Sequence, residues 1–181
     1  MTTQNGPQFF GYGSLVNTRT HAYPYARPAE VSGWRRAWRH TGLRDVAFLT
    51  AVPCPDTTIS GLVAAVPDGD WMALDEREAA YRRHAAKTSY GDAAIYAIDH
   101  DHQPPSQQHP ILLSYLDVVV QGYFQVFGVQ GVSDFFATTD GWDAPILNDR
   151  AAPRYPRHQM LSPTETRLVD ENLSAVGAKW T

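Results

Sequence analysis

The stretch FFGYGSL, residues 9–15, restricts the backbone of this 181-residue chain more than any other. Two large aromatic residues are typical of the end of a buried strand. The glycines that alternate with Tyr12 and Ser14 let the chain turn sharply and stay bare on one side, so that a ligand can approach the main chain. Successive free N–H groups in such a turn form a small anion-binding concavity. The sequence therefore predicts a strand followed by a loop that holds a carboxylate or a developing oxyanion.

Composition predicts a soluble globular protein with one domain, residues 1–181. Hydrophobic residues make up 43% and charged residues 19% of the chain, and this length can bury a core without disulfides or metals. The net charge of −4 argues against general nucleic-acid binding. A single cysteine, Cys54, excludes an intramolecular disulfide. We find no secretion signal and no apolar run near the roughly 20 residues that cross a bilayer, so we expect a cytoplasmic protein without a membrane partner. Its oligomeric state is left open.

Several segments are typical of strands. Residues 29–41 mix tryptophans with arginines, which favours a bent strand with one wet face. Residues 46–52 and 59–66 are short and β-branched, and they predict two strands paired with each other, with PCPDTTIS as the turn region. Residues 93–98 predict one more strand. Together with the helices described next, these segments predict a mixed α+β fold.

A helix is predicted within residues 67–85, where acidic residues precede arginines as the helix dipole prefers. Asp68 or Asp70 is the expected N-cap. Spacings of three and seven place the apolar residues of this helix on one stripe: Trp71, Leu74 and Tyr81. Glu78 falls on the same stripe, so the helical period predicts one carboxylate among core-facing residues.

A carboxylate in that position has two interpretations. Burial raises the pKa of a glutamate, which makes it a useful general base or acid near neutral pH. Alternatively, Glu78 forms a structural ion pair with an arginine such as Arg35 or Arg39. The residues alone favour the ion pair, because structural pairs are the commoner reason for a glutamate on a core face.

The second half of the chain is predicted to be mainly helical. Pro110 begins a strong helix that Gly128 ends, with a wide apolar stripe: Leu112, Tyr115, Leu116, Val119, Tyr123 and Phe127. A shorter helical piece follows over residues 131–139. The last helix has Ser162 as N-cap and Glu165 completing a capping box. The irregular, aromatic-rich residues 140–160 are expected to pack over a site.

Several familiar motifs are excluded. The loop lacks the third glycine of a dinucleotide fingerprint, and no P-loop lysine follows. Ser14 does not lie in a nucleophile elbow, because Val16 stands where the last glycine belongs. The histidine-rich residues 99–110 have no scaffold that would hold a metal ion. A bare-backbone turn and a semi-buried Glu78 remain, and together they suit proton abstraction next to a carbonyl.

Three ordered motifs resemble the γ-glutamylcyclotransferase-like superfamily, which includes the ChaC proteins, the γ-glutamylamine cyclotransferases and the AIG2-like proteins. They are FGYGSL at residues 10–15, LDEREAAYRR at residues 74–83, and the pair YLDVVVQGYFQVFG and TTDGWDAPILNDRAAPRYPR in the second half. The resemblance covers most of the chain. It implies a small mixed-sheet β-barrel flanked by helices.

The resemblance also implies roles for particular residues. The loop would bind the γ-glutamyl group through main-chain amides, and Glu78 would be the acid–base residue. The implied substrate-binding residues are Tyr12, Gly13, Ser14, Leu15, Tyr155 and Tyr123. No cofactor or metal is required, and the partner is a small-molecule γ-glutamyl substrate.

The implied reaction is intramolecular aminolysis that releases 5-oxoproline from a γ-glutamyl peptide or amine. The leaving group, whether that of glutathione or of another compound, is left open, as is the subfamily. The alternative is a catalytically silent module of the same fold that binds a small carboxylate.

Overall fold

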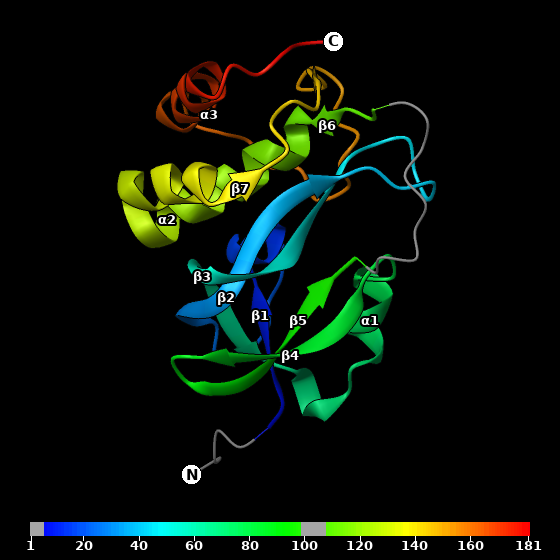
Figure 1. Cartoon of the computed structure of the whole chain (residues 1–181), viewed down its shortest axis with the longest axis vertical. Helices are drawn as coiled ribbons and strands as arrows, with labels where there is room; N and C mark the ends of the chain where they lie inside the picture. The colour runs from blue at the N-terminus through cyan, green and yellow to red at the C-terminus, as the bar shows by residue number, and fades with distance from the viewer. Residues whose placement is uncertain (1–5, 99–107) are drawn as a thin grey trace.

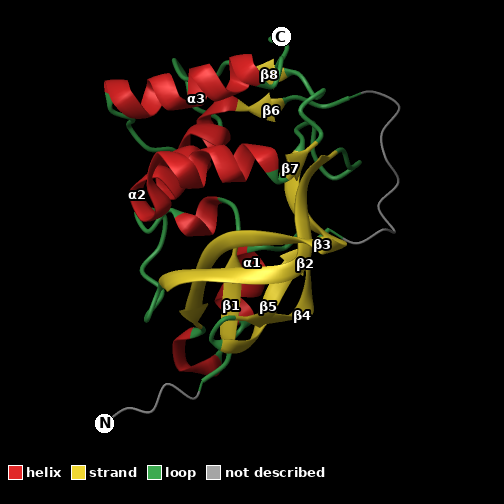
Figure 2. Cartoon of the chain, turned by 60° about the vertical axis from the view of Figure 1, so that its left-hand side comes forward, coloured by secondary structure: helices red, strands yellow, loops and turns green. Residues whose placement is uncertain are grey.

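Five strands form a closed barrel in the computed structural model, which describes residues 6–98 and 108–181 (Figures 1 and 2). They are β1 (Gln8–Gly11), β2 (Arg27–Arg39), β3 (Phe48–Ala65), β4 (Arg82–Thr88) and β5 (Gly91–Ala97). The order around the sheet is β3-β1-β5-β4-β2, and pairing of β2 with β3 closes it. Only β1 and β5 run parallel among these pairs. The prediction of an α+β fold with a small mixed barrel is confirmed.

Strand β1 runs through the middle of the sheet, between β3 and β5. Phe10 pairs with Val63 on one side and with Ile95 on the other. Both phenylalanines of the strand are 1% exposed, so the chain enters the following turn from a fully buried position. That turn is the short 3-10 helix η1 (Ser14–Val16). Because the loop follows a buried central strand, the position of its first residue is fixed.

The prediction of two strands paired with each other is wrong. Residues 46–52 and 59–66 lie mostly on one long strand, β3, and both halves pair with β2. The register shifts where Ser32 pairs with Thr58 and Trp34 with Pro53, so residues 54–57 have no partner on β2. Opposite them, Gly33 takes a positive φ of 85°. The prolines therefore lie in a bulge within one long strand and not in a hairpin turn.

The helix predicted within residues 67–85 is much shorter than expected. After the 3-10 turn η2 (Pro67–Gly69), α1 spans only Met72–Arg77, with Trp71 at the N-cap position. Asp70 contributes by accepting a hydrogen bond from the Met72 N–H at 2.9 Å. The following arginines belong to β4, whose seven residues all pair with β5. Sheet pairing outweighs local helix propensity here.

A layer of helices packs on one side of the barrel (Figure 2). The long helix α2 (Leu113–Ala137) is interrupted at Gly128, which has a positive φ of 69°, as the predicted break requires. It starts three residues after Pro110, because residues 111–112 form the short strand β6 (Ile111–Leu112), parallel to β8 (Ile146–Leu147). Strand β7 (Thr139–Asp140) extends the sheet beside β2.

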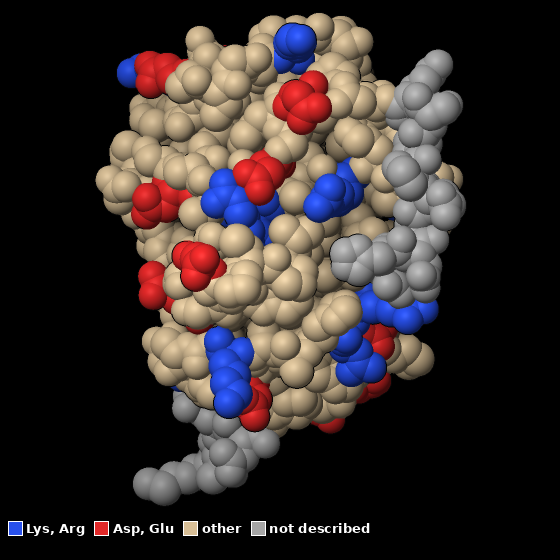
Figure 3. Space-filling model, viewed as in Figure 1, with Lys and Arg blue, Asp and Glu red and all other residues tan. Residues whose placement is uncertain are grey.

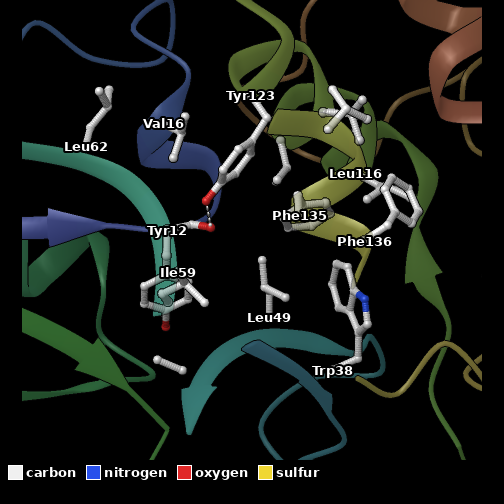
Figure 4. Close-up of a cluster of buried hydrophobic side chains, with 14 of the residues drawn as sticks. Tyr12, Val16, Trp38, Leu49, Ile59, Leu62, Leu116, Tyr123, Phe135 and Phe136 are labelled. Carbon is white, nitrogen blue, oxygen red and sulfur yellow. Dashed lines mark hydrogen bonds between the residues drawn. The ribbon is translucent and has the colours of Figure 1, made fainter. Parts of the chain in front are cut away.

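The core between barrel and helices is rich in aromatic residues (Figure 4). Tyr123 and Phe135 from α2 are 0% exposed and lie 5.0 Å apart between ring centroids. Helix α2 also approaches η1 closely, since a Cβ on Gly122 would lie 2.7 Å from the Asn17 nitrogen. The Asn17 side chain in turn donates to the Val118 carbonyl at 2.9 Å. The central helix therefore supports the loop directly.

The last helix, α3 (Pro163–Ala175), packs on α2 and begins as predicted. Ser162 and Glu165 form the capping box, and Val169 and Leu173 are fully buried. Within the described residues, no helix is long and apolar enough to span a membrane. On the face drawn in Figure 3, acidic and basic side chains are interspersed among uncharged ones, so this face carries no extended patch of one sign.

Candidate active site

Two adjoining hollows meet beside the glycine loop. A cavity of about 690 Å³ lies between β3, the turn after α1 and residues 154–157. A recess of about 30 Å³ is lined by the loop itself, residues 10–15. Five residues line both hollows: Ser14, Leu49, Glu78, Tyr81 and Tyr115. The recess is therefore the inner end of the larger cavity, with Glu78 at the junction.

The Tyr12 carbonyl at the start of the loop is held from the core between the barrel and α2. Arg36 donates to it from Nε at 3.0 Å. The Tyr123 hydroxyl lies 2.8 Å from the same oxygen and 2.7 Å from the Ser60 carbonyl, so it donates to one of them at a time (Figure 4). This carbonyl consequently faces the core and not the recess.

The next three loop carbonyls are also occupied by protein donors. The acceptor–donor pairs are Gly13 O with Val16 N–H (3.0 Å), Ser14 O with the Thr20 hydroxyl (3.1 Å), and Leu15 O with His21 Nε2 (2.8 Å). His21 Nδ1 accepts from the Tyr23 N–H at 3.2 Å, so Nε2 is the ring nitrogen that donates, and burial lowers the pKa of this ring. In a trans peptide the N–H points opposite to the carbonyl. The amides of Gly13, Ser14 and Leu15 are therefore turned away from these donors.

The Tyr115 hydroxyl covers the loop on its open side. The backbone N–H of Ser14 lies on this side of the loop and opposes the rise that burial causes in the pKa of Tyr115. The Tyr115 hydroxyl lies 2.8 Å from the position that a Cβ on Gly13 would take. Only glycine fits at position 13 with Tyr115 in this place. Tyr115 was predicted as a core residue of the helix stripe, and its proximity to the loop is a feature that helical periodicity does not reveal.

Glu78 lies at the C-terminal end of α1 and takes the C-cap position. The predicted helical stripe is therefore not what places it, because Tyr81 follows a turn closed by its N–H and the Glu78 carbonyl at 2.8 Å. The Glu78 side chain is 16% exposed, and its carboxylate is 3.5 Å from Arg77 Nε. Burial raises the pKa of Glu78, and the charges of Arg77 and Arg157 oppose that rise. A raised pKa suits a proton-transfer group.

The ion pairs expected for Glu78 are not formed. Arg35 instead pairs with Asp140, with Nε and Oδ2 2.7 Å apart. Among the described residues no ion pair joins Glu78 to Arg39 either. The contact with Arg77 is longer than a charge-assisted hydrogen bond, and Arg77 donates to the Thr20 hydroxyl and carbonyl at 3.1 and 3.3 Å. The carboxylate is therefore left with capacity to accept a further hydrogen bond or a proton.

Tyrosines surround the carboxylate. The Tyr81 hydroxyl donates to the Leu49 carbonyl at 2.7 Å, and the Tyr12 hydroxyl donates to the Tyr96 carbonyl at 2.5 Å. Burial raises the pKa of the Tyr12, Tyr81 and Tyr115 hydroxyls, and the nearby Glu78 charge adds to each rise. These hydroxyls therefore stay protonated, and they surround Glu78 without adding negative charge.

Residues 149–157 close the outer side of the cavity. Asp149 accepts from the backbone N–H and hydroxyl of Ser114 at 2.7 and 2.5 Å and from the Arg154 N–H at 2.9 Å. Burial opposes ionisation, but these hydrogen bonds outweigh it and lower the pKa of Asp149. The Tyr155 ring then packs edge-on against Tyr115, with centroids 5.0 Å apart. The segment does pack over a hollow, as its aromatic content predicts.

The structure brings most of the predicted site residues together. Tyr12, Gly13, Ser14, Leu15 and Glu78 line the recess. Tyr155 lines the larger cavity. Tyr123 lines neither hollow: it is fully buried behind the loop and bonded to the Tyr12 carbonyl.

The histidine-rich residues 99–107 lie outside the described residues. His109 is described, and its N–H donates to His40 Nδ1 at 3.0 Å. No group of three or more histidine, cysteine, aspartate or glutamate side chains is arranged to hold a metal ion in the described ranges.

Comparison with solved structures shows the fold class. A structure titled γ-glutamyl cyclotransferase aligns with a TM-score of 0.57 and 14% identity, over 91% of this chain and 98% of that one. An uncharacterised human protein aligns with a TM-score of 0.59 and 15% identity, over 90% and 97%. YkqA from Bacillus subtilis aligns with a TM-score of 0.56 and 17% identity, over 76% of this chain and 57% of that one. The barrel with flanking helices is thus the fold of these proteins.

Sequence comparison then gives the family. The family model described as "Gamma-glutamyl cyclotransferase, AIG2-like" matches residues 9–115, more than half of the chain. The protein belongs to this family. The matched range includes the glycine loop and Glu78. No curated protein matches the chain.

Proposed function

We propose that this protein is a γ-glutamylcyclotransferase that releases 5-oxoproline from a γ-glutamyl peptide or amine. The observation that supports this most is the junction of the two hollows. There, a buried carboxylate with a raised pKa, Glu78, lies beside a loop whose carbonyls all point elsewhere. Membership of the family makes this chemistry the natural candidate.

The proposed reaction is an intramolecular attack. Glu78 takes a proton from the substrate α-ammonium group, and the freed amine attacks the γ-carbonyl carbon of the same glutamyl group. A five-membered ring closes as the new C–N bond forms. The bond to the leaving nitrogen then breaks as Glu78 returns the proton to that nitrogen. Glu78 next takes the second proton from the ring nitrogen and passes it to the released amine. The products are 5-oxoproline and a free amine or amino acid.

The loop amides of Gly13, Ser14 and Leu15 hold the glutamyl group and stabilise the charge that develops on oxygen. Because both reacting groups belong to one molecule, the site has mainly to hold the reactive conformer and move protons. Tyr155 contributes to the wall of the outer cavity, where the leaving group would lie.

A screen of γ-glutamyl peptides and amines for 5-oxoproline release tests the proposal. Glu78→Gln keeps the shape of the side chain but removes its proton-accepting oxygen, and we expect kcat/KM to fall by roughly 100-fold to 10,000-fold, the usual range for general acid–base groups. Glu76→Gln is the matched control, because Glu76 lies on the same helix and lines the same cavity. We expect it to keep nearly full activity.

Full activity of the Glu78→Gln variant would contradict the assignment. Thermal stabilisation by a γ-glutamyl compound that is recovered unchanged would favour the alternative, a silent binding module of the same fold.

A further inference from the structure

Arg36 is a charged side chain in the core of the protein. It belongs to β2 and is 0% exposed. Arg150, by contrast, pairs with Asp117 and Asp170 at 2.8 and 2.9 Å. No carboxylate pairs with Arg36 anywhere in the part of the chain that the structure describes. A buried charge without a counter-ion is costly, so its retention calls for a reason.

The partners of Arg36 are neutral oxygens. Besides the Tyr12 carbonyl, the guanidinium donates to the Ser60 carbonyl at 2.6 Å and to the Tyr123 hydroxyl at 2.5 Å. It also donates to the Thr138 hydroxyl at 2.7 Å. The planar fork of an arginine makes several such bonds at fixed angles, which a lysine cannot do. Arg36 thereby joins the loop, β3 and the end of α2.

The bond to the Tyr12 carbonyl bears directly on the recess. The Tyr12 oxygen and the Gly13 N–H belong to one rigid peptide group and point in opposite directions. Neither Arg36 nor Tyr123 lines the recess, whereas Tyr12 and Gly13 do. A positive charge on the carbonyl side draws electron density toward the oxygen and makes the N–H a stronger donor, as in any chain of hydrogen bonds.

We infer that Arg36 is a positioning residue of the candidate active site. It fixes the Tyr12–Gly13 peptide and polarises it, so that the Gly13 N–H is presented to the substrate oxygen as a strengthened donor. Tyr123 assists by bonding the same carbonyl without a charge. This inference rests on the proposed function for its effect on catalysis, but the state of the Gly13 amide can be measured without any substrate.

Four variants separate positioning from mere structural support. Arg36→Lys keeps the charge and loses the fork. Tyr123→Phe keeps the ring and removes the hydroxyl, which accepts from Arg36 and donates to the Tyr12 or the Ser60 carbonyl. Phe135→Leu is the matched control, because its ring packs 5.1 Å from the Arg36 guanidinium carbon without touching the loop. Arg36→Ala opens a space in which added guanidinium ion can take the place of the lost group.

The first readout is the amide resonance of Gly13 in a ¹H–¹⁵N spectrum of the ligand-free protein. We expect an upfield proton shift in Arg36→Lys, a smaller one in Tyr123→Phe, and none in Phe135→Leu. If Arg36→Lys does not fold, the Gly13 resonance of Tyr123→Phe still tests the inference. An unchanged Gly13 resonance in a folded Arg36→Lys or Tyr123→Phe variant would overturn the inference.

The second readout is 5-oxoproline release well below the melting temperature. We expect kcat to fall roughly 10-fold to 100-fold in Arg36→Lys, somewhat less than the cost of deleting an oxyanion donor, with partial rescue of Arg36→Ala by guanidinium ion. Loss of stability with unchanged kcat would show a structural role only and would overturn the catalytic effect. If the wild-type protein releases no 5-oxoproline from any γ-glutamyl compound, the proposed function fails, and the Gly13 resonance alone decides the role of Arg36.

Discussion

The two halves of the candidate site are built in opposite ways. The glycine loop follows a buried central strand, and its carbonyls are all bound from behind by groups of the core and of residues 16–21. Glu78 ends a helix of six residues in which only Leu74 is buried. That helix is attached by side chains, with Arg77 bonded to Thr20 and Asp75 bonded to Tyr96 at 2.5 Å.

This difference suggests a division of tasks. A group that binds charge works best when it is preorganised, so that no reorganisation accompanies the reaction. A group that moves a proton between two nitrogens benefits from a less constrained anchor. We therefore expect substitutions in the loop to act mainly on the geometry of the site, and substitutions around α1 to act on stability and on the pKa of Glu78.

Among the variants that keep Glu78, the largest effect is expected from Gly13→Ala. The new Cβ would lie 2.8 Å from the Tyr115 hydroxyl and 3.2 Å from Leu49 Cδ2, so the loop or the tyrosine must move. We expect 5-oxoproline release to fall roughly 100-fold or more, as when an oxyanion donor is lost. Gly42→Ala is the control, because nothing lies within 4 Å of its Cβ position. Equal activity of the two variants would show that the loop is not rigid.

The side-chain hydrogen bonds that attach α1 to Thr20 are tested by Arg77→Met. This substitution removes the hydrogen bonds to Thr20, and we expect a loss of about 1.5 kcal/mol in the free energy of unfolding, measured by urea denaturation. Arg83→Met is the control. Its partner Asp75 is 3.1 Å away, and both side chains are 41% exposed, so we expect a loss below about 1 kcal/mol. A larger loss for the control would place the anchor of α1 elsewhere.

The charges around Glu78 are tested by the pH dependence of kcat/KM. A general base must be ionised, so activity should fall as the pH drops through the raised pKa of Glu78. The charge of Arg157 opposes the rise in the pKa of Glu78. Arg157→Met should therefore shift the fall of kcat/KM on the acidic side of the pH profile to higher pH. Arg44→Met, at the rim of the same cavity, should leave it in place. If the fall of kcat/KM moves to lower pH in Arg157→Met, its assignment to Glu78 is contradicted.

The smallest effect is expected in the stability of Glu78→Gln. Because burial raises the folded-state pKa of Glu78 above its unfolded value, the folded protein binds the proton more tightly. Wild-type stability should therefore fall as the pH rises from the unfolded pKa through the folded one. The glutamine variant lacks this loss, so it should melt at a higher temperature than wild type near pH 7, and the gap should close below the unfolded pKa. A lower melting temperature near pH 7 would show that the charge stabilises the fold.

Local chemistry in the sequence was enough to predict several elements. The aromatic strand, the glycine turn and the capping box of α3 depend on contacts between near neighbours. The break at Gly128 follows from its backbone freedom. The long-range pairings could not be predicted in this way. Residues 82–88 have helical neighbours in sequence, yet they pair with β5, and residues 54–57 look like a turn although the strand continues past them.

The helical pattern singled out Glu78, but the structural reason behind that prediction was wrong. Its spacing from Leu74 and Tyr81 suggested one helical face, but the helix ends before Glu78 and a turn carries Tyr81 to the same cavity.

Sequence reasoning missed Arg36 because a charged side chain is usually exposed, although strand alternation puts residue 36 on the same face as Trp34 and Trp38. Only the structure shows that Arg36 is fully buried between the barrel and α2, in contact with Tyr123 and Thr138.

The place of β1 in the barrel also has a consequence for how the protein is made. This strand and the glycine loop leave the ribosome before β3 and β5, and the pairings of Phe10 form only once Val63 and Ile95 have been synthesised. Distant pairings of this kind slow folding, because the entropic cost of closing a long loop comes before any contact that stabilises it. The glycine loop, although it precedes β5 in the sequence, is therefore completed only after β5 has been synthesised. Pairs of nascent chains that end before and after β5 should differ sharply in protease resistance at the N-terminus.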